Sequence, residues 1–117
     1  MIKIKRVYEE PSPGDGMRIL VDRVWPRGIS KERARLADWR KALAPSTALR
    51  KWFGHDPAKW KGFRDRYRAE LTRAGQIDAL KELARLSRRK TVTLLYGAAD
   101  EKHNQAVALK EVLDELA

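Results

Sequence analysis

The sequence contains no cysteine and only two histidines among its 117 residues. Without thiols, the chain can form no disulfide framework, thiolate nucleophile or Cys-ligated metal site. Two histidines alone cannot make a His-rich metal site. We expect neither a metal nor a cofactor. No apolar run approaches the roughly 18 residues of a membrane span, and the N-terminal MIKIKRVYEE lacks the apolar core of a signal peptide. These absences predict a reduced, cytoplasmic protein that does not contact a membrane.

Basic side chains, in contrast, are abundant. Lys and Arg number 26 against 16 Asp and Glu, which gives a formal net charge of +10. The apolar fraction of 43% is typical of globular proteins, and the length suits one domain, which we expect to span residues 1–117. Residues 31–90 hold 18 of the basic side chains and 7 of the acidic ones, so the basic excess lies in the middle of the chain.

This basic excess has three open interpretations. A basic patch interleaved with aromatic residues is typical of nucleic-acid binding, which would make this an accessory protein without catalysis. The charge could equally form an ordinary solvated surface, because helix surfaces tolerate arginine well. A third interpretation is an interaction module whose basic face meets an acidic protein partner. The candidate nucleic-acid contacts are Arg50, Lys51, Lys61, Arg64, Arg68, Arg88 and Arg89.

Three segments have the composition of β-strands. Residues 2–7 nearly alternate apolar and basic side chains, and a second strand is centred on residues 19–21 and ends near residues 22–25. Residues 91–96 are β-branched and apolar enough to be buried on both faces of a sheet. A loop rich in proline and glycine, residues 9–16, separates the first two strands. Its length permits either a hairpin or a crossover without a helix.

Helical signals fill the middle of the chain. Ser30 and Ser46 are candidate N-caps, the second for a helix over residues 47–53. Asp56, followed by proline, predicts the start of a longer helix that ends at Gly75. The apolar stripes of this helix and of the next one are formed by Trp60, Phe63, Tyr67 and Leu71, and by Ile77, Leu80, Leu83 and Leu86.

The last helix is expected from about Glu101 to Leu116, with Asp100 as its N-cap. The order strand, strand, several helices, strand, helix is typical of an α/β protein. A strand that returns to a sheet after helices usually runs parallel to its predecessor. We therefore predict a single compact α/β domain with a small, mainly parallel sheet of about three strands and helices packed around it.

Two segments that follow predicted strands, residues 22–28 and 96–104, carry most of the chemically suggestive side chains. Ligands of parallel sheets bind beyond the carboxyl ends of the strands. We therefore predict a pocket there for a small phosphorylated or nucleotide-like ligand, with hydrolase or group-transferase activity left open. The candidate ligand-binding residues are Arg23, Trp25, Arg27, Tyr96, Gly97 and Asn104, and the candidate catalytic residues are Asp22, Asp100 and His103.

These roles follow from the chemistry of the side chains. The guanidinium groups of Arg23 and Arg27 match the geometry of phosphate, and the N-terminus of the last helix would add backbone N–H donors. The aromatic candidates could stack on a base, either carboxylate could act as a general base, and His103 could act as an acid or a base. Each group also has a structural interpretation: an Asp22–Arg23 ion pair, a tryptophan in the core, Asp100 as a plain helix cap, or a solvated histidine.

Several blocks of the sequence resemble a known family. They are Arg18–Glu32 (RILVDRVWPRGISKE), Leu43–Thr47 (LAPST), Leu49–Pro57 (LRKWFGHDP) and Leu94–Asp100 (LLYGAAD), together with Trp39, Trp60, Phe63, Tyr67, His103, Asn104 and Ala106. These blocks cover nearly the whole chain and resemble the domain-of-unknown-function 488 family, in its YeaO-like branch. The resemblance implies a compact α/β protein and supplies no reaction. The wider family looks to have cysteines in the block after the third strand, and this chain has none, so no thiol chemistry carries over.

Overall fold

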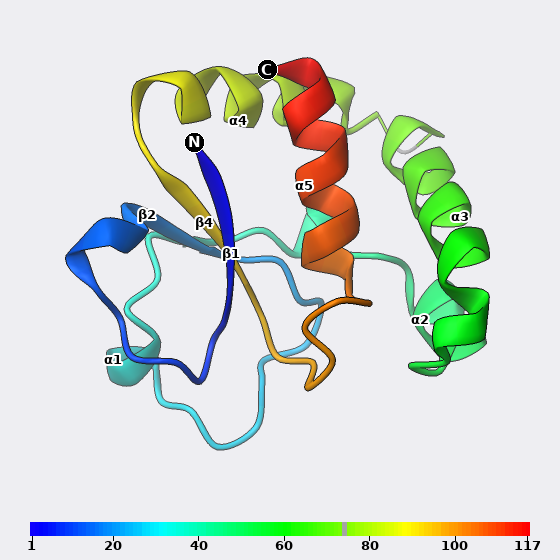
Figure 1. Ribbon diagram of the computed structural model, residues 1–117, viewed down its shortest axis with the longest axis horizontal. Coiled ribbons are helices and arrows are strands. Elements are labelled where there is room, and N and C mark those ends of the chain that lie inside the picture. Colours follow the sequence, from blue (N-terminus) through cyan, green and yellow to red (C-terminus); the bar gives the residue numbers. More distant parts are fainter. Residues whose placement is uncertain (74) are drawn as a thin grey trace.

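The computed structural model of the protein describes residues 1–73 and 75–117. Its sheet contains β1 (Ile2–Arg6), β2 (Met17–Leu20), β3 (Asp38–Trp39) and β4 (Val92–Tyr96), in the order β1-β4-β2-β3. All neighbouring strands pair in parallel (Figure 1). The prediction of a small parallel sheet in an α/β fold is therefore confirmed, with one strand more than expected. The additional strand, β3, has two residues and is too short to show a periodic pattern in the sequence.

β1 and β2 are not neighbours, because β4 lies between them. The connection between them is therefore a crossover, and residues 7–16, all of which the structure describes, contain the 3₁₀ turn η1 (Pro13–Asp15) and no α-helix. The buried carboxylate of Asp15 holds this turn by accepting hydrogen bonds from Lys5 (3.1 Å) and Arg18 (2.6 Å). Gly16 ends the turn at a φ of +61°, where a Cβ atom would overlap the backbone carbonyl of Thr91.

In the described residues, five α-helices and two further 3₁₀ turns complete the fold. They are α1 (Lys31–Ala34), η2 (Lys41–Leu43), α2 (Thr47–Phe53), η3 (Pro57–Lys59), α3 (Trp60–Arg73), α4 (Ile77–Arg89) and α5 (Gln105–Leu116). Ser30 and Ser46 cap α1 and α2 as predicted, since each side chain accepts a hydrogen bond from the backbone N–H three residues later. Asp56 caps η3, which leads directly into α3. None of the helices in the described part of the chain is long and apolar enough to span a bilayer.

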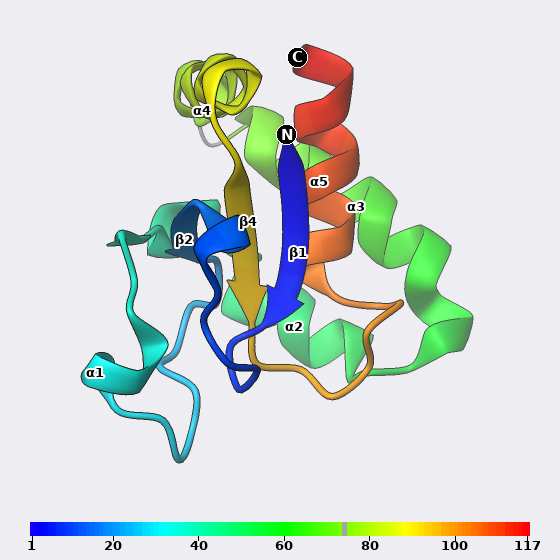
Figure 2. The same ribbon diagram turned by 60° about the vertical axis from the view of Figure 1, so that its left-hand side comes forward.

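The two faces of the sheet are covered differently (Figures 1 and 2). Helices α2 to α5 pack on one face around a large cluster that includes Ile19 and Leu94 from the sheet. A smaller cluster covers the other face, where Leu20 and Leu95 pack with Ala34 of α1. Successive residues of a strand point to opposite faces, and both faces of β4 are covered, so all five of its residues are buried; four are Val, Leu or Tyr, and the fifth is Thr93.

Two predicted boundaries are wrong, and both lie next to the predicted pocket. The second strand ends at Leu20 rather than near residues 22–25, although the N–H of Val21 still donates to Leu95. The last helix begins at Gln105 rather than near Glu101. Its N-cap is not Asp100 but Asn104, whose side-chain oxygen accepts a hydrogen bond from the backbone N–H of the residue three positions later (3.1 Å).

Candidate functional site

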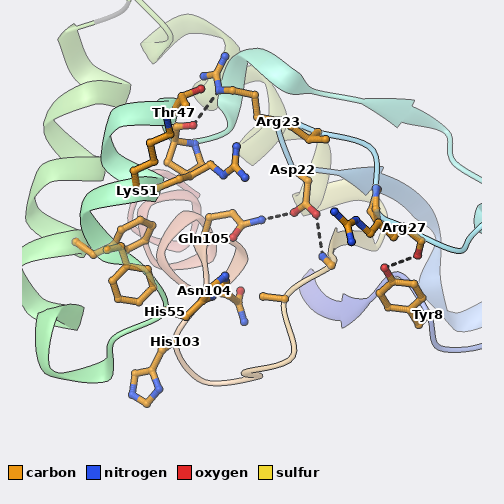
Figure 3. A pocket seen from close by; sticks show the side chains of 18 residues that line it. Tyr8, Asp22, Arg23, Arg27, Thr47, Lys51, His55, His103, Asn104 and Gln105 are labelled. Carbon is orange, nitrogen blue, oxygen red and sulfur yellow. Dashed lines mark hydrogen bonds between the residues drawn. The ribbon is translucent and has the colours of Figure 1, made fainter.

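A cavity of about 510 Å³ lies beyond the carboxyl ends of β2 and β4 (Figure 3). One wall is the loop after β2, residues 22–27, joined by Tyr8 from the end of β1. The opposite wall comes from α2 and the turn after it, and the segment from Gly97 to the start of α5 lies between the two walls. The lining includes Asp22, Arg23, Arg27, Thr47, Arg50, Lys51, His55, Gly97, His103, Asn104 and Gln105.

Asp22 is the one carboxylic acid among the lining residues, all of which the structure describes. One of its carboxylate oxygens accepts a hydrogen bond from the backbone N–H of Gly97 (3.0 Å), and the other accepts one from the side-chain amide of Gln105. Burial raises the pKa of Asp22 to about 6, although the Gly97 hydrogen bond, the positive charge of Arg50 and the Gln105 amide each oppose the rise. The group is therefore fixed in position and loses its charge in mildly acidic solution.

The close approach of Asp22 favours glycine at position 97. A Cβ atom there would lie 2.9 Å from a carboxylate oxygen of Asp22 and 3.3 Å from the Cβ of Pro26. The predicted ligand-binding role of Gly97 is therefore limited, because its N–H is already donated to Asp22.

The cationic side chains of the pocket fall into two groups. Arg23 donates to the backbone carbonyls of Pro45 (3.0 Å) and Ala44 (3.1 Å), so it ties the loop after β2 to the segment before α2. Two of the five N–H donors of its guanidinium group are therefore used within the protein, whereas the sequence led us to expect the whole group to be available to an anion. Three other cations, Arg27, Arg50 and Lys51, line the cavity with exposed side chains. No hydrogen bond or ion pair joins any of these three side chains to another described residue.

His103 and Asp100 form a pair at the outer rim rather than at the centre of the pocket. The Nδ1 atom of His103 lies 2.9 Å from a carboxylate oxygen of Asp100, and its ring meets Trp60 edge-on with centroids 5.4 Å apart. Figure 3 shows the imidazole directed away from Asp22. Hydrogen bonds from the Lys102 backbone and the His103 side chain lower the pKa of Asp100, which does not line the cavity. The three predicted catalytic residues therefore do not converge.

Asn104 lines the pocket, but its side chain is used within the protein. Its oxygen caps α5, and its nitrogen donates to the backbone carbonyl of Asp100 (2.9 Å). The expected anion site at the N-terminus of the last helix is therefore partly occupied by this cap.

Trp25 and Tyr96 do not line the cavity. The indole nitrogen of Trp25 donates to the backbone carbonyl of Ile29 (2.8 Å), and its ring packs edge-on against Trp39 at 5.4 Å. Tyr96 is 2% exposed and belongs to the larger core cluster. Both rings are held by packing, so the expectation that either one stacks on a base in this pocket is wrong.

The candidate nucleic-acid residues are divided among three places. Lys61 pairs with Asp65 on α3 (2.9 Å), while Arg64 and Arg68 pair with Glu111 (2.7 Å) and Glu115 (2.6 Å) on α5. Arg50 and Lys51 line the pocket, and Arg88 and Arg89 lie at the end of α4. The seven residues therefore do not form one continuous free basic face.

Some pocket residues were not predicted from the sequence, among them Tyr8, Thr47, His55 and Gln105. Only some of them have a sequence feature that could have indicated the pocket. Tyr8 follows β1, so it would have been expected at the same edge of the sheet if the direction of β1 had been known. Thr47 and His55 lie on or next to α2, and nothing in the local sequence indicates that α2 faces the ends of the strands. Gln105 could have been found only after the start of α5 was placed correctly.

The pocket can thus hold an anion against three free cations beside a fixed carboxylic acid. Within the described residues, no group of three or more His, Cys, Asp or Glu side chains could hold a metal ion. The apolar part of the lining, which includes Pro26, Pro45, Phe53 and Phe63, offers contact surface to the carbon skeleton of a ligand.

Comparisons with known proteins agree with the resemblance seen in the sequence blocks. The chain matches the family model described as the inactive DUF488-N3 subclade over residues 1–117. It is 43% identical over 115 residues to the uncharacterized protein YeaO of Escherichia coli (strain K12), with 98% of both chains covered. It is 39% identical over 113 residues to the uncharacterized protein Rv3073c of Mycobacterium tuberculosis, with 97% of this chain and 93% of the relative covered. No solved structure matches the chain. This protein therefore belongs to the DUF488 family, in its inactive DUF488-N3 subclade.

Proposed function

We propose that the protein binds a small phosphorylated ligand in the pocket beyond β2 and β4, without transforming it. The observation that carries this proposal is the trio of free cations, Arg27, Arg50 and Lys51, lining one cavity with a single carboxylic acid. Guanidinium and ammonium groups bind phosphate through charge-assisted hydrogen bonds, and no side chain of these three is engaged in a hydrogen bond or ion pair with another described residue.

Binding without catalysis is supported by the separation of the candidate catalytic groups. A general acid and a general base must both lie within hydrogen-bond reach of the reacting atoms. Asp22 is held by Gly97 and Gln105, whereas His103 is paired with Asp100 at the rim. The description of the matching subclade as inactive agrees with this interpretation.

The proposal is tested by titrating the protein with ribose 5-phosphate and with AMP, each against its unphosphorylated parent, ribose or adenosine. Isothermal titration calorimetry should show that each phosphorylated probe binds at least about tenfold more tightly than its parent, because charge-assisted hydrogen bonds to the phosphate add about 1.5–3 kcal/mol. Phosphorus NMR of the same mixtures should show the phosphate esters intact. Equal affinity for the phosphorylated and unphosphorylated probes contradicts the proposal.

A matched pair of variants locates the binding site. Replacing Arg50 and Lys51 by alanine should abolish the preference for the phosphorylated probes, because two of the three free cations are lost. Replacing Arg64 and Arg68 by alanine removes the same charge from α3, where both side chains are already paired with α5. This control should leave the preference unchanged, and equal losses in the two variants would mean that only net charge matters.

A further inference from the structure

The position of Asp22 restricts which chemical groups the ligand can carry in addition to its phosphate. A carboxylate in a pocket for anions repels the ligand unless the ligand brings a hydrogen-bond donor to it. Each oxygen of Asp22 accepts one hydrogen bond from the protein, from Gly97 or from Gln105. A carboxylate offers about four lone-pair sites, so each oxygen retains capacity for a further donor.

The charges around Asp22 restrict the kind of donor. Arg50 attracts the carboxylate through space without a hydrogen bond to it, and Arg23, Arg27 and Lys51 also line the pocket. These cations would repel a ligand ammonium group, whereas a neutral hydroxyl group can donate to Asp22 without this cost.

The size and lining of the cavity also exceed what a phosphate ion alone requires. A volume of about 510 Å³ lies in the range of sites for small organic molecules. Pro26 lies beside Asp22 and Gly97, and Phe53 lies on the side of α2, so a carbon skeleton between the carboxylic acid and the cations would contact apolar surface.

We propose that Asp22 is a specificity-determining residue that accepts a hydrogen bond from a hydroxyl group of the ligand, so that the ligand is a hydroxylated phosphate monoester of the sugar phosphate class. This inference rests on the proposed function, since it concerns the same pocket. Gly97 and Gln105 hold the carboxylate in place, and the free cations hold the phosphate. Inorganic phosphate and phosphate esters without hydroxyl groups can contact the cations, but they have no carbon-bound hydroxyl group to donate to Asp22.

The test compares ribose 5-phosphate with tetrahydrofurfuryl phosphate, which has the same ring and phosphate without the hydroxyl groups. Calorimetry with the unmodified protein near neutral pH should show that ribose 5-phosphate binds about tenfold more tightly, as expected for a hydrogen bond to a charged acceptor. In the Asp22→Asn variant this ratio should fall at least about threefold, because the acceptor is then neutral. Tetrahydrofurfuryl phosphate should bind this variant at least as tightly as it binds the unmodified protein, since a repelling charge is gone.

Asp100→Asn is the matched control, because it removes a carboxylate near the rim that does not line the cavity, and it should leave the ratio unchanged. Equal affinity of the unmodified protein for the two probes overturns the inference, whether or not the Asp22 variant folds. If both probes bind equally and both depend on Arg50 and Lys51, the proposed function holds and only the role of Asp22 is refuted. If neither probe binds, the proposed function itself fails.

Discussion

Replacing Asp22 by asparagine should stabilise the folded protein at neutral pH, against the usual effect of changing a buried polar residue. Burial raises the pKa of Asp22 from its ordinary value of 3.8 to about 6 in the folded state. The unfolded chain therefore releases this proton at a lower pH than the folded chain does. Below about pH 4 the group is protonated in both states, and it has no effect on the free energy of unfolding.

Between about pH 4 and 6 the unfolded state loses the proton while the folded state keeps it, so stability falls as the pH rises through this window. A pKa difference of about 2 between the two states lowers the free energy of unfolding by about 3 kcal/mol above pH 6. Asp22 borders the cavity and is partly exposed, so solvent screening weakens this effect. We therefore expect the Asp22→Asn variant to gain about 1–3 kcal/mol in its free energy of unfolding near neutral pH. Asparagine keeps the shape of the side chain: its oxygen can accept from Gly97, and its nitrogen can donate to a reoriented Gln105 amide.

The assay is urea denaturation of both proteins, followed by tryptophan fluorescence, at several pH values between about 4 and 7.5. The variant should match the unmodified protein at the acidic end and exceed it in stability at the neutral end. Other titrating groups, including the Asp15 network, affect both proteins equally and cancel in the difference. A variant that is less stable near neutral pH, or a difference that does not change with pH, would refute the reasoning.

Two further substitutions test the framework around the pocket. Gly16→Ala should lower the free energy of unfolding by about 3 kcal/mol, because the residue has a φ of +61° and its Cβ would overlap the Thr91 carbonyl; a loss below 1 kcal/mol in urea denaturation would contradict this placement. Asn104→Ala should cost about 1 kcal/mol through the loss of the α5 cap, measured in the same way, and an unchanged stability would contradict the assignment of Asn104 as the cap.

Local signals in the sequence predicted the elements whose structure is decided locally. Ser46 marked the start of α2 to the residue, because a serine side chain satisfies a backbone N–H that the helix itself leaves unpaired. The mostly apolar run of β4 predicted burial on both faces, and β4 is one of the two inner strands of the sheet. Local sequence could not locate the start of α5, because Asp100 and Asn104 are both residue types that cap helices well. In the structure the N-cap is Asn104.

The candidate site was predictable in its position but not in its contacts. The rule for ligands of parallel sheets placed it beyond the strand ends, where the cavity lies. The same rule could not show that Arg23 is held by backbone carbonyls about 20 residues later in the chain, or that Arg50 and Lys51 come from α2 to face the loop after β2. These contacts depend on how α2 packs, which no local pattern in the chain encodes.

The order of strands in the sheet has a consequence for how the protein is made. β1 and β2 are synthesised well before β4, which lies between them in the folded sheet and begins only at residue 92. Until most of the chain has been synthesised, both strands present unpaired edges and apolar side chains, which are the features that promote aggregation. The sheet therefore forms through contacts between distant parts of the sequence, which predicts slow folding for a protein of this size and a period of exposure during translation.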